Sequence, residues 1–85
     1  MEKALRLNPM NAQRRERKYE CWYYYDKYGE KHRDGDYPAI DCDDGSQVWY
    51  QHGKTHRDGD KPAVILANGC KRWYKNDKFI KEEGC

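Results

Sequence analysis

Two stretches of this chain decide its fold, and they are nearly identical: His32-Arg33-Asp34-Gly35-Asp36-Tyr37-Pro38-Ala39 and His56-Arg57-Asp58-Gly59-Asp60-Lys61-Pro62-Ala63. The second follows the first at an offset of 24 residues, without a gap. The match extends outward to further pairs at the same offset: Gly29 with Gly53, Gly45 with Gly69, Trp49 with Trp73, and Tyr50 with Tyr74. Self-similarity at a fixed period of this length is typical of repeat architectures. We therefore interpret the chain as two full repeat units with partial units at both ends.

Turn and strand signals alternate inside each unit. Asp44-Gly45 and Asn68-Gly69 favour hairpin turns, because glycine tolerates positive φ. Residues 47–50 and 71–74 are short runs of β-forming types, and Pro62 stands where a further strand begins. No window carries apolar residues at helical spacing. The sequence predicts a mainly all-β fold, a meander of short antiparallel β-hairpins.

The even period has a consequence for the aromatic residues. Side chains alternate between the two faces of a strand, so residues 24 positions apart point the same way. Trp49 and Trp73 are expected to share one face, and Tyr50 and Tyr74 the other. One of these rows forms the core, and the other is either covered by the N-terminal segment or exposed as an interaction surface.

Length and composition indicate one small domain with an aromatic core. The chain has 85 residues, with only eight Leu, Ile or Val but twelve Phe, Trp or Tyr. Each aromatic side chain buries roughly 150–250 Å², which offsets the aliphatic poverty. We expect residues 19–85 to form a single β-repeat domain and residues 1–18 to form a basic N-terminal arm or short helix. Asn8 suits an N-cap and Pro9 suits the first helical position.

The basic charge is concentrated at the N-terminus. Residues 1–20 hold six basic and three acidic groups, whereas residues 21–85 hold 11 basic and 12 acidic groups. A dedicated DNA-binding protein usually has a strongly basic face, which the repeat body lacks. The arm is either solvated or bound, through its cations, to an acidic protein surface or a phosphate backbone.

The repeated pattern Trp-Tyr-x-x-Gly-Lys-x-His-Arg-Asp-Gly-Asp-x-Pro-Ala, from Trp49 to Ala63, resembles the MORN-like repeat variant of bacteriophage and giant-virus hypothetical proteins. The resemblance covers about residues 22–79. It implies a β-hairpin repeat fold, a phage or viral origin, and an interaction scaffold without enzymatic activity. The first unit departs from the pattern by an insertion before Gly29, and the last lacks the His-Arg element. Both look like capping units.

The four cysteines, Cys21, Cys42, Cys70 and Cys85, contain no Cys-x-x-Cys pair, and no apolar segment suggests secretion or a membrane span. We therefore expect free thiols in a reducing compartment, the host cytoplasm if the chain is phage-encoded.

Other chemistry is disfavoured by the residue pattern. His-Arg-Asp matches the kinase catalytic-loop tripeptide, but the other kinase elements are missing. The interpretation we favour is structural: the imidazole packs at a turn, the arginine stacks on Trp or Tyr, and the aspartate bonds to the backbone. The scattered Asp, His and Cys residues lack the spacing of calcium or zinc sites, so no metal or cofactor is expected. Without a nucleophile or paired acid and base, neither catalysis nor a small-molecule substrate is expected.

The function that we expect is a protein-interaction module, such as a phage accessory protein that binds and inhibits a host or defence protein. Tyr, Trp and Arg dominate binding hot spots. The candidate partner-binding residues are Arg14, Arg15, Arg17, Lys18, Arg33, Tyr50, Arg57 and Tyr74. The candidate structural residues of the repeat are His32, Gly35, Pro38, Trp49, His56, Gly59, Pro62 and Trp73. The alternatives are single-stranded nucleic-acid binding and self-association through sheet edges. Membrane binding is disfavoured because no cationic amphipathic helix is present.

Overall fold

The chain folds as a β-protein over the part that the structure describes. The computed structural model describes residues 14–85, and no helix occurs among them. Its strands are β2 (Arg14–Lys18), β3 (Cys21–Tyr25), β4 (Ile40–Cys42), β5 (Gln47–Val48), β6 (Tyr50–Gln51), β7 (Lys54–Thr55), β8 (Val64–Ile65), β9 (Lys71–Lys75) and β10 (Lys78–Glu83). The prediction of a mainly β fold with antiparallel strands is confirmed. Residues 14–85 contain no helix, and therefore no helix that could cross a membrane.

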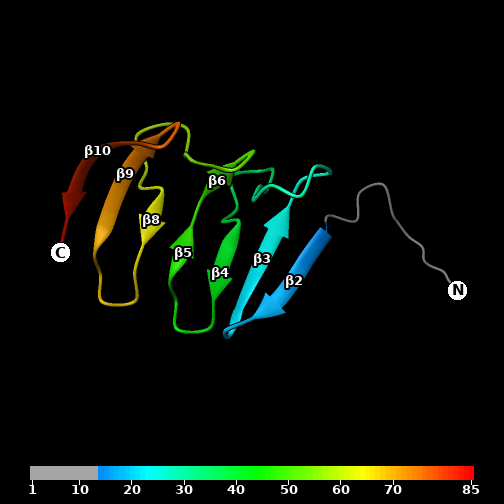
Figure 1. Cartoon of the computed structure of the whole chain (residues 1–85). Coiled ribbons are helices and arrows are strands. Elements are labelled where there is room, and N and C mark those ends of the chain that lie inside the picture. Colours follow the sequence, from blue (N-terminus) through cyan, green and yellow to red (C-terminus); the bar gives the residue numbers. More distant parts are fainter. Residues whose placement is uncertain (1–13) are drawn as a thin grey trace, which may run out of the picture.

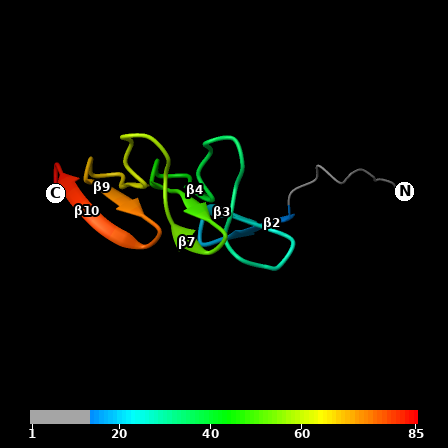
Figure 2. The same cartoon turned by 90° about the horizontal axis from the view of Figure 1, so that it is seen from above.

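The strands form one long sheet and one small hairpin. The seven-stranded sheet has the order β10-β9-β8-β5-β4-β3-β2, and all its pairs are antiparallel (Figure 1). The hairpin of β6 and β7 branches off between β5 and β8. Seen from above, β10 and β2 lie at opposite ends, with the connecting loops between them (Figure 2). Within residues 14–85 the open sheet therefore has two edge strands, β2 and β10.

The two sheet hairpins of the repeat are built alike, with bonds that recur at the offset of 24 residues. In the first, the Cys42 N–H donates to the Ser46 carbonyl, and in the second the Leu66 N–H donates to the Cys70 carbonyl. An Asp44 carboxylate oxygen accepts from the Ser46 N–H in the first turn, and the Asn68 amide oxygen accepts from the Cys70 N–H in the second. The adjoining glycines have φ values of 95° and 93°. Both expected turns are therefore present.

The core is thin and lies between the sheet and the two His-Arg-Asp-Gly-Asp loops. Ala39 and Ala63 are completely buried at the ends of these loops, and Tyr24 and Trp49 are buried beside them. The Ala39 carbonyl accepts from the Tyr24 N–H, and the Ala63 carbonyl accepts from the Trp49 N–H. Because both side chains are completely buried in a close-packed interior, a larger residue would have to displace its neighbours, which accounts for the recurring alanine.

The expectation of an N-terminal arm or short helix is wrong for residues 14–18, the part of that segment that the structure describes. Residues 14–18 belong to strand β2 instead of a helix or arm, and they pair with β3 from Arg14↔Tyr25 to Lys18↔Cys21. Tyr19 and Glu20 make the two-residue turn between the strands, with φ values of 54° and 60°. The proposed cap at Asn8-Pro9 lies outside the described residues.

The cysteines are paired, contrary to the expectation of free thiols. Cys21 bonds to Cys42 and Cys70 bonds to Cys85. Cys21 and Cys42 are direct cross-strand partners of β3 and β4, so the sheet register brings them together. The second disulfide ties the beginning of β9 to the chain beyond β10. One disulfide thus links the inner strands β3 and β4, and the other ties down the chain after the edge strand β10.

Candidate functional site

Three cations stack on three aromatic rings along the sheet. The guanidinium of Arg33 lies 3.8 Å from the ring centre of Tyr24, and that of Arg57 lies 3.8 Å from Trp49. The ammonium of Lys81 lies 4.6 Å from Trp73. The cations occur at an exact offset of 24 residues, and the last unit uses Lys81 where the others use arginine. The expected stacking of the repeat arginines on Trp or Tyr is present.

Both loop arginines are also bonded to the backbone of their own loop. Arg33 Nη1 donates to the Pro38 carbonyl at 3.2 Å, and Arg57 Nη1 donates to the Pro62 carbonyl at 3.0 Å. Only 14% of the Arg57 side chain is exposed. A guanidinium held between a ring and a carbonyl closes the loop over the core. These two candidates for partner binding are therefore part of the packed fold.

The repeat histidines connect each unit to the next one. His32 Nδ1 accepts the His52 N–H at 3.1 Å, and His56 Nδ1 accepts the Asn76 N–H at 3.1 Å. The other ring nitrogen of each lies 2.7 or 2.8 Å from a carboxylate, of Asp34 for His32 and of Asp58 for His56. Because Nδ1 accepts, Nε2 must carry the hydrogen and donate it to the aspartate. Asp34 and Asp58 thus bond to histidine, which differs from the expected bond to backbone.

Asp36 is the main polar junction between the two full units. Its carboxylate accepts from Arg57 Nε at 2.9 Å and from Lys61 Nζ at 3.0 Å, and its carbonyl accepts from Trp49 Nε1 at 3.1 Å. The Arg57 hydrogen bond, followed by that of Lys61, holds the pKa of the Asp36 carboxyl below its usual value. Every one of these donors comes from the following unit, so Asp36 fixes how the units stack.

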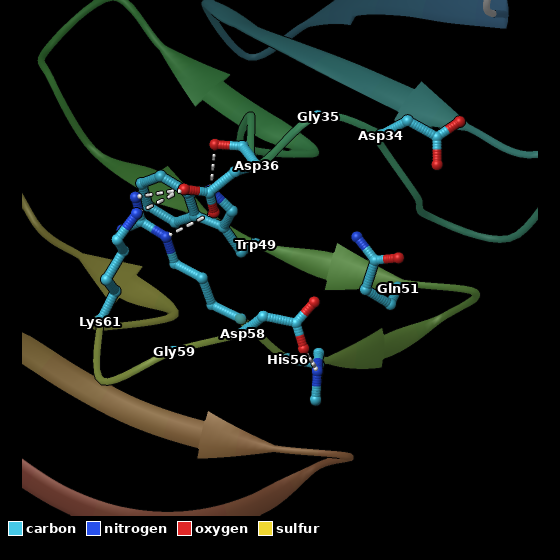
Figure 3. Close-up of a pocket in the computed structure, with 10 residues that line it drawn as sticks. Asp34, Gly35, Asp36, Trp49, Gln51, His56, Asp58, Gly59 and Lys61 are labelled. Carbon is cyan, nitrogen blue, oxygen red and sulfur yellow. Dashed lines mark hydrogen bonds and ion pairs between the residues drawn. The ribbon is translucent and has the colours of Figure 1, made fainter.

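A groove of about 410 Å³ runs between the two loops (Figure 3). It is lined by Asp34, Gly35, Asp36, Trp49, Gln51, His56, Arg57, Asp58, Gly59 and Lys61. Figure 3 shows Lys61 directed at Asp36, and His56 beside Asp58, so the charged groups of the groove serve one another. Ser46 and Thr55, the single serine and the single threonine of the chain, do not line it. Across residues 14–85 no three His, Cys, Asp or Glu side chains gather as a potential metal site. The groove is the seam between units.

The edge strand β2, unlike the groove, is fully exposed and rich in cations. All five of its residues are exposed, and four of them are cations. Arg15 and Arg17 lie over Trp22 at 4.2 and 5.5 Å, on one face of the sheet. Arg14 lies over Tyr25 at 5.6 Å and Lys18 over Tyr23 at 5.1 Å, on the other. The result is a strand of exposed cations above aromatic rings.

The acidic groups near β2 are few. Arg17 forms an ion pair with Asp43, and this hydrogen bond lowers the pKa of the Asp43 carboxyl. Glu16 accepts a hydrogen bond from the Tyr25 hydroxyl at 3.0 Å and pairs with Lys18 at 3.3 Å. Its pKa is lowered, chiefly by Tyr25 and then by Lys18. Glu20, in the turn after β2, also acts on Arg17, and these three anions beside four cations leave the edge positive.

The structure divides the predicted partner residues into separate places. Arg14, Arg15, Arg17 and Lys18 come together on β2, whereas Arg33 and Arg57 lie in the loops. Tyr50, on β6, carries Lys31 over its ring at 5.5 Å. Tyr74, on β9, packs edge-on against Phe79.

Sequence reasoning missed three contributors. Tyr24 takes the place of Trp49 in the first unit, because one extra residue separates it from the following histidine. Lys81 could have been found by extending the 24-residue offset from Arg57. The sequence indicates Trp22 as the beginning of the first unit's Trp-Tyr pattern, and this gave no indication of its place beneath the edge arginines. No protein-family model, curated protein or solved structure matches this chain.

Proposed function

We propose that this chain is a non-enzymatic protein-interaction module of MORN-like repeats that binds its partner through strand β2. The observation that carries the proposal is the exposure of all five residues of β2, four of them cationic, above three aromatic rings. Arginine and aromatic side chains are the residue types that contribute most to binding hot spots. A positive edge also accelerates encounter with a negative partner.

The loop arginines support this assignment, because their hydrogen-bond donors are already used within the fold. The donors of Arg57 serve Pro62 and Asp36, and those of Arg33 serve Pro38. Breaking such bonds to reach a partner costs roughly 1.5–3 kcal/mol for each charged hydrogen bond, which a binding contact must first recover. The partner-binding set proposed here is therefore Arg14, Arg15, Arg17 and Lys18, with Tyr50 and Tyr74 outside it.

The biological setting belongs to the same proposal. The MORN-like resemblance supports a phage accessory protein that binds and inhibits a host or defence protein in the host cytoplasm. The paired cysteines remove the argument from free thiols, since disulfides persist mainly in oxidising compartments. Binding is therefore best assayed with both the oxidised and the reduced protein.

Affinity purification of the tagged protein from bacterial lysate, with and without nuclease, tests the proposal. The variant R14Q/R15Q/R17Q/K18Q removes the β2 cations. The control K27Q/K54Q/K71Q/K78Q removes the same charge from exposed lysines elsewhere. We expect one stoichiometric, nuclease-resistant protein with the wild type and the control, and its loss with the β2 variant. Equal capture by both variants would move the interaction away from β2.

Binding of single-stranded nucleic acid is a second candidate, favoured by the same pattern of cations beside Trp22, Tyr23 and Tyr25. Against it, the rings already carry cations on their faces, so a base must displace an arginine or lysine in order to stack. This candidate predicts capture that disappears with nuclease and binding that weakens steeply with salt.

A further inference from the structure

The two edges of the sheet differ in regularity. Strand β2 pairs with β3 through five consecutive residue pairs without a shift. Strand β10 pairs with β9 through a register shift between Phe79 and Lys81, and its end is tied down by the Cys70–Cys85 disulfide. A β-bulge is one device that keeps an edge from pairing with another strand, because it twists the edge away. Of the two edges, β2 is the one with the regular backbone that strand addition needs.

The outward-facing backbone groups of β2 follow from its neighbour. Tyr24 donates its N–H to Ala39 and accepts the His32 N–H at its carbonyl, so both groups point away from β2. Its direct partner Arg15 must then form a non-hydrogen-bonded pair and turn its own N–H and carbonyl toward the open edge. The antiparallel alternation gives the same direction to Arg17, two residues on. Among residues 14–85 no strand pairs with this side of β2.

The charge of the edge selects the partner. An added strand would lie beside Arg15 and Arg17 on one face of the sheet and beside Arg14 and Lys18 on the other. Directly opposed charges of opposite sign stabilise a strand pair, and like charges oppose it. A second copy of β2 carries the same four cations, so two copies repel at this edge. An acidic strand is complementary on both faces.

We infer that the open edge of β2 binds an extended acidic segment of a partner protein as an additional strand. Backbone bonds to Arg15 and Arg17 provide the register, and the four cations select for acidic side chains. This mode of recognition combines main-chain hydrogen bonds with side-chain selectivity. The inference rests on the proposed function and specifies its partner.

A direct test uses the full-length protein and a fluorescent peptide of about eight residues, in which pairs of glutamates alternate with pairs of valines. This pattern places glutamates on both faces of an added strand, and the peptide is long enough to span the five residues of β2. Two further probes are the same peptide with N-methyl groups on alternate amides, and a lysine-valine peptide. We expect the acidic peptide to bind at least about tenfold more tightly than either. The N-methylated peptide loses two backbone bonds, which account for about that factor, and the lysine peptide meets like charges. Equal binding of the N-methylated peptide would show that charge alone acts, and would overturn the inference.

Two substitutions at one position separate backbone from charge. Arg15→Pro removes an outward N–H that β3 does not use, and proline is tolerated at such edge positions. Arg15→Gln keeps the N–H and removes the charge. We expect Arg15→Pro to weaken peptide binding about tenfold and Arg15→Gln only a few-fold. Thermal unfolding of both variants checks that the sheet is retained, and the lysine-valine peptide serves as the background.

Amide hydrogen exchange gives a readout that does not depend on any variant. With the acidic peptide bound, the amides of Arg15 and Arg17 should exchange at least about tenfold more slowly. Those of Arg14 and Glu16, which face β3, should not change. Uniform change, or protection confined to the loops, contradicts strand addition. If a protein is captured through the β2 cations but the N-methylated peptide binds as well as its parent, the proposed function stands and this inference fails. Binding of polyuridylate in place of the peptides would favour nucleic acid instead.

Discussion

The two arginine-bearing regions of this molecule, the His-Arg loops and the edge strand β2, use the same contact for different purposes. Arg57 lies 3.8 Å above Trp49 in a loop, and Arg15 lies 4.2 Å above Trp22 at the edge. Arg57 is also bonded to Pro62 and Asp36, and its side chain is 14% exposed. Arg15 is exposed on a strand that has no outer neighbour within residues 14–85. Stacking on a ring does not by itself distinguish a binding arginine from a structural one. The burial of Arg57 and its bond to the backbone of its own loop mark it as structural.

The largest expected effect is a loss of stability when the aromatic ring beneath a loop arginine is removed. Trp49→Ala removes a buried ring that supports Arg57 and bonds to Asp36, so we expect it to lower the free energy of unfolding by about 3–5 kcal/mol. Trp22→Ala, beneath the edge arginines, should cost clearly less, because Trp22 is only half-buried. Urea denaturation of both variants measures the difference. Equal losses would show that the edge supports the fold as much as the loops do.

The next prediction compares the arginines themselves. Arg57→Ala removes charged hydrogen bonds to Asp36 and Pro62 and should lower the free energy of unfolding by about 1.5–3 kcal/mol. Arg15→Ala changes an exposed surface residue and should stay within about 0.5 kcal/mol. Chemical denaturation with matched baselines is sufficient. A destabilising Arg15→Ala would contradict the division between the two regions.

A smaller effect distinguishes the two repeat tryptophans. Trp49→Phe loses the bond to the Asp36 carbonyl and should cost about 1 kcal/mol. Trp73→Phe removes a buried N–H that has no hydrogen-bond partner among residues 14–85, so it should be neutral or slightly stabilising, because the desolvation penalty of that group disappears. Thermal unfolding of the pair gives the sign. A destabilised Trp73→Phe would place an unrecognised acceptor beside this ring.

The smallest effect concerns acid. The pKa of Asp36 is lowered by Arg57 and then Lys61, that of Asp43 by Arg17, and that of Asp26 mainly by His52. A carboxyl whose pKa is lower when folded stabilises the fold above its unfolded pKa of about 4, and this contribution is lost as pH falls through the folded pKa. We therefore expect stability to decline below about pH 4.

Asp36→Asn should make that acid decline shallower. The control Asp60→Asn, 24 positions later, changes a carboxylate that forms no ion pair with residues 14–85, and it should leave the decline unaltered. Denaturation at several pH values distinguishes the two variants. If stability fell with pH at the same rate in both variants, the ion pairs of Asp36 would not stabilise the junction between units.

Much of the fold follows from local signals in the sequence. Asp44-Gly45 and Asn68-Gly69 specify their turns because glycine supplies positive φ at low cost, and the aspartate or asparagine bonds to the backbone. Strand β2 could not be predicted from the sequence, because its residues are all polar and show no alternation of polar and apolar side chains. Its turn also uses Tyr19 and Glu20 at positive φ. Non-glycine residues rarely adopt that conformation, so no turn was indicated there.

The site was less predictable than the fold, because its contacts join distant units. The sequence indicated that Arg33 and Arg57 would stack on aromatic rings. It did not indicate that Asp36 bonds to Arg57, a contact between residues 21 positions apart that depends on how the units stack. The Cys21–Cys42 pair likewise emerges only from the register of β3 and β4.

The central claim is that the loop arginines hold the fold and the edge arginines bind the partner. It is tested most directly by measuring unfolding and lysate capture side by side for Arg57→Ala and for R15A/R17A. The account predicts that Arg57→Ala is destabilised yet, at a temperature where it is folded, still captures the partner. It predicts that R15A/R17A keeps its stability and loses the partner. The opposite assignment, capture lost with Arg57→Ala and retained with R15A/R17A, would contradict the account.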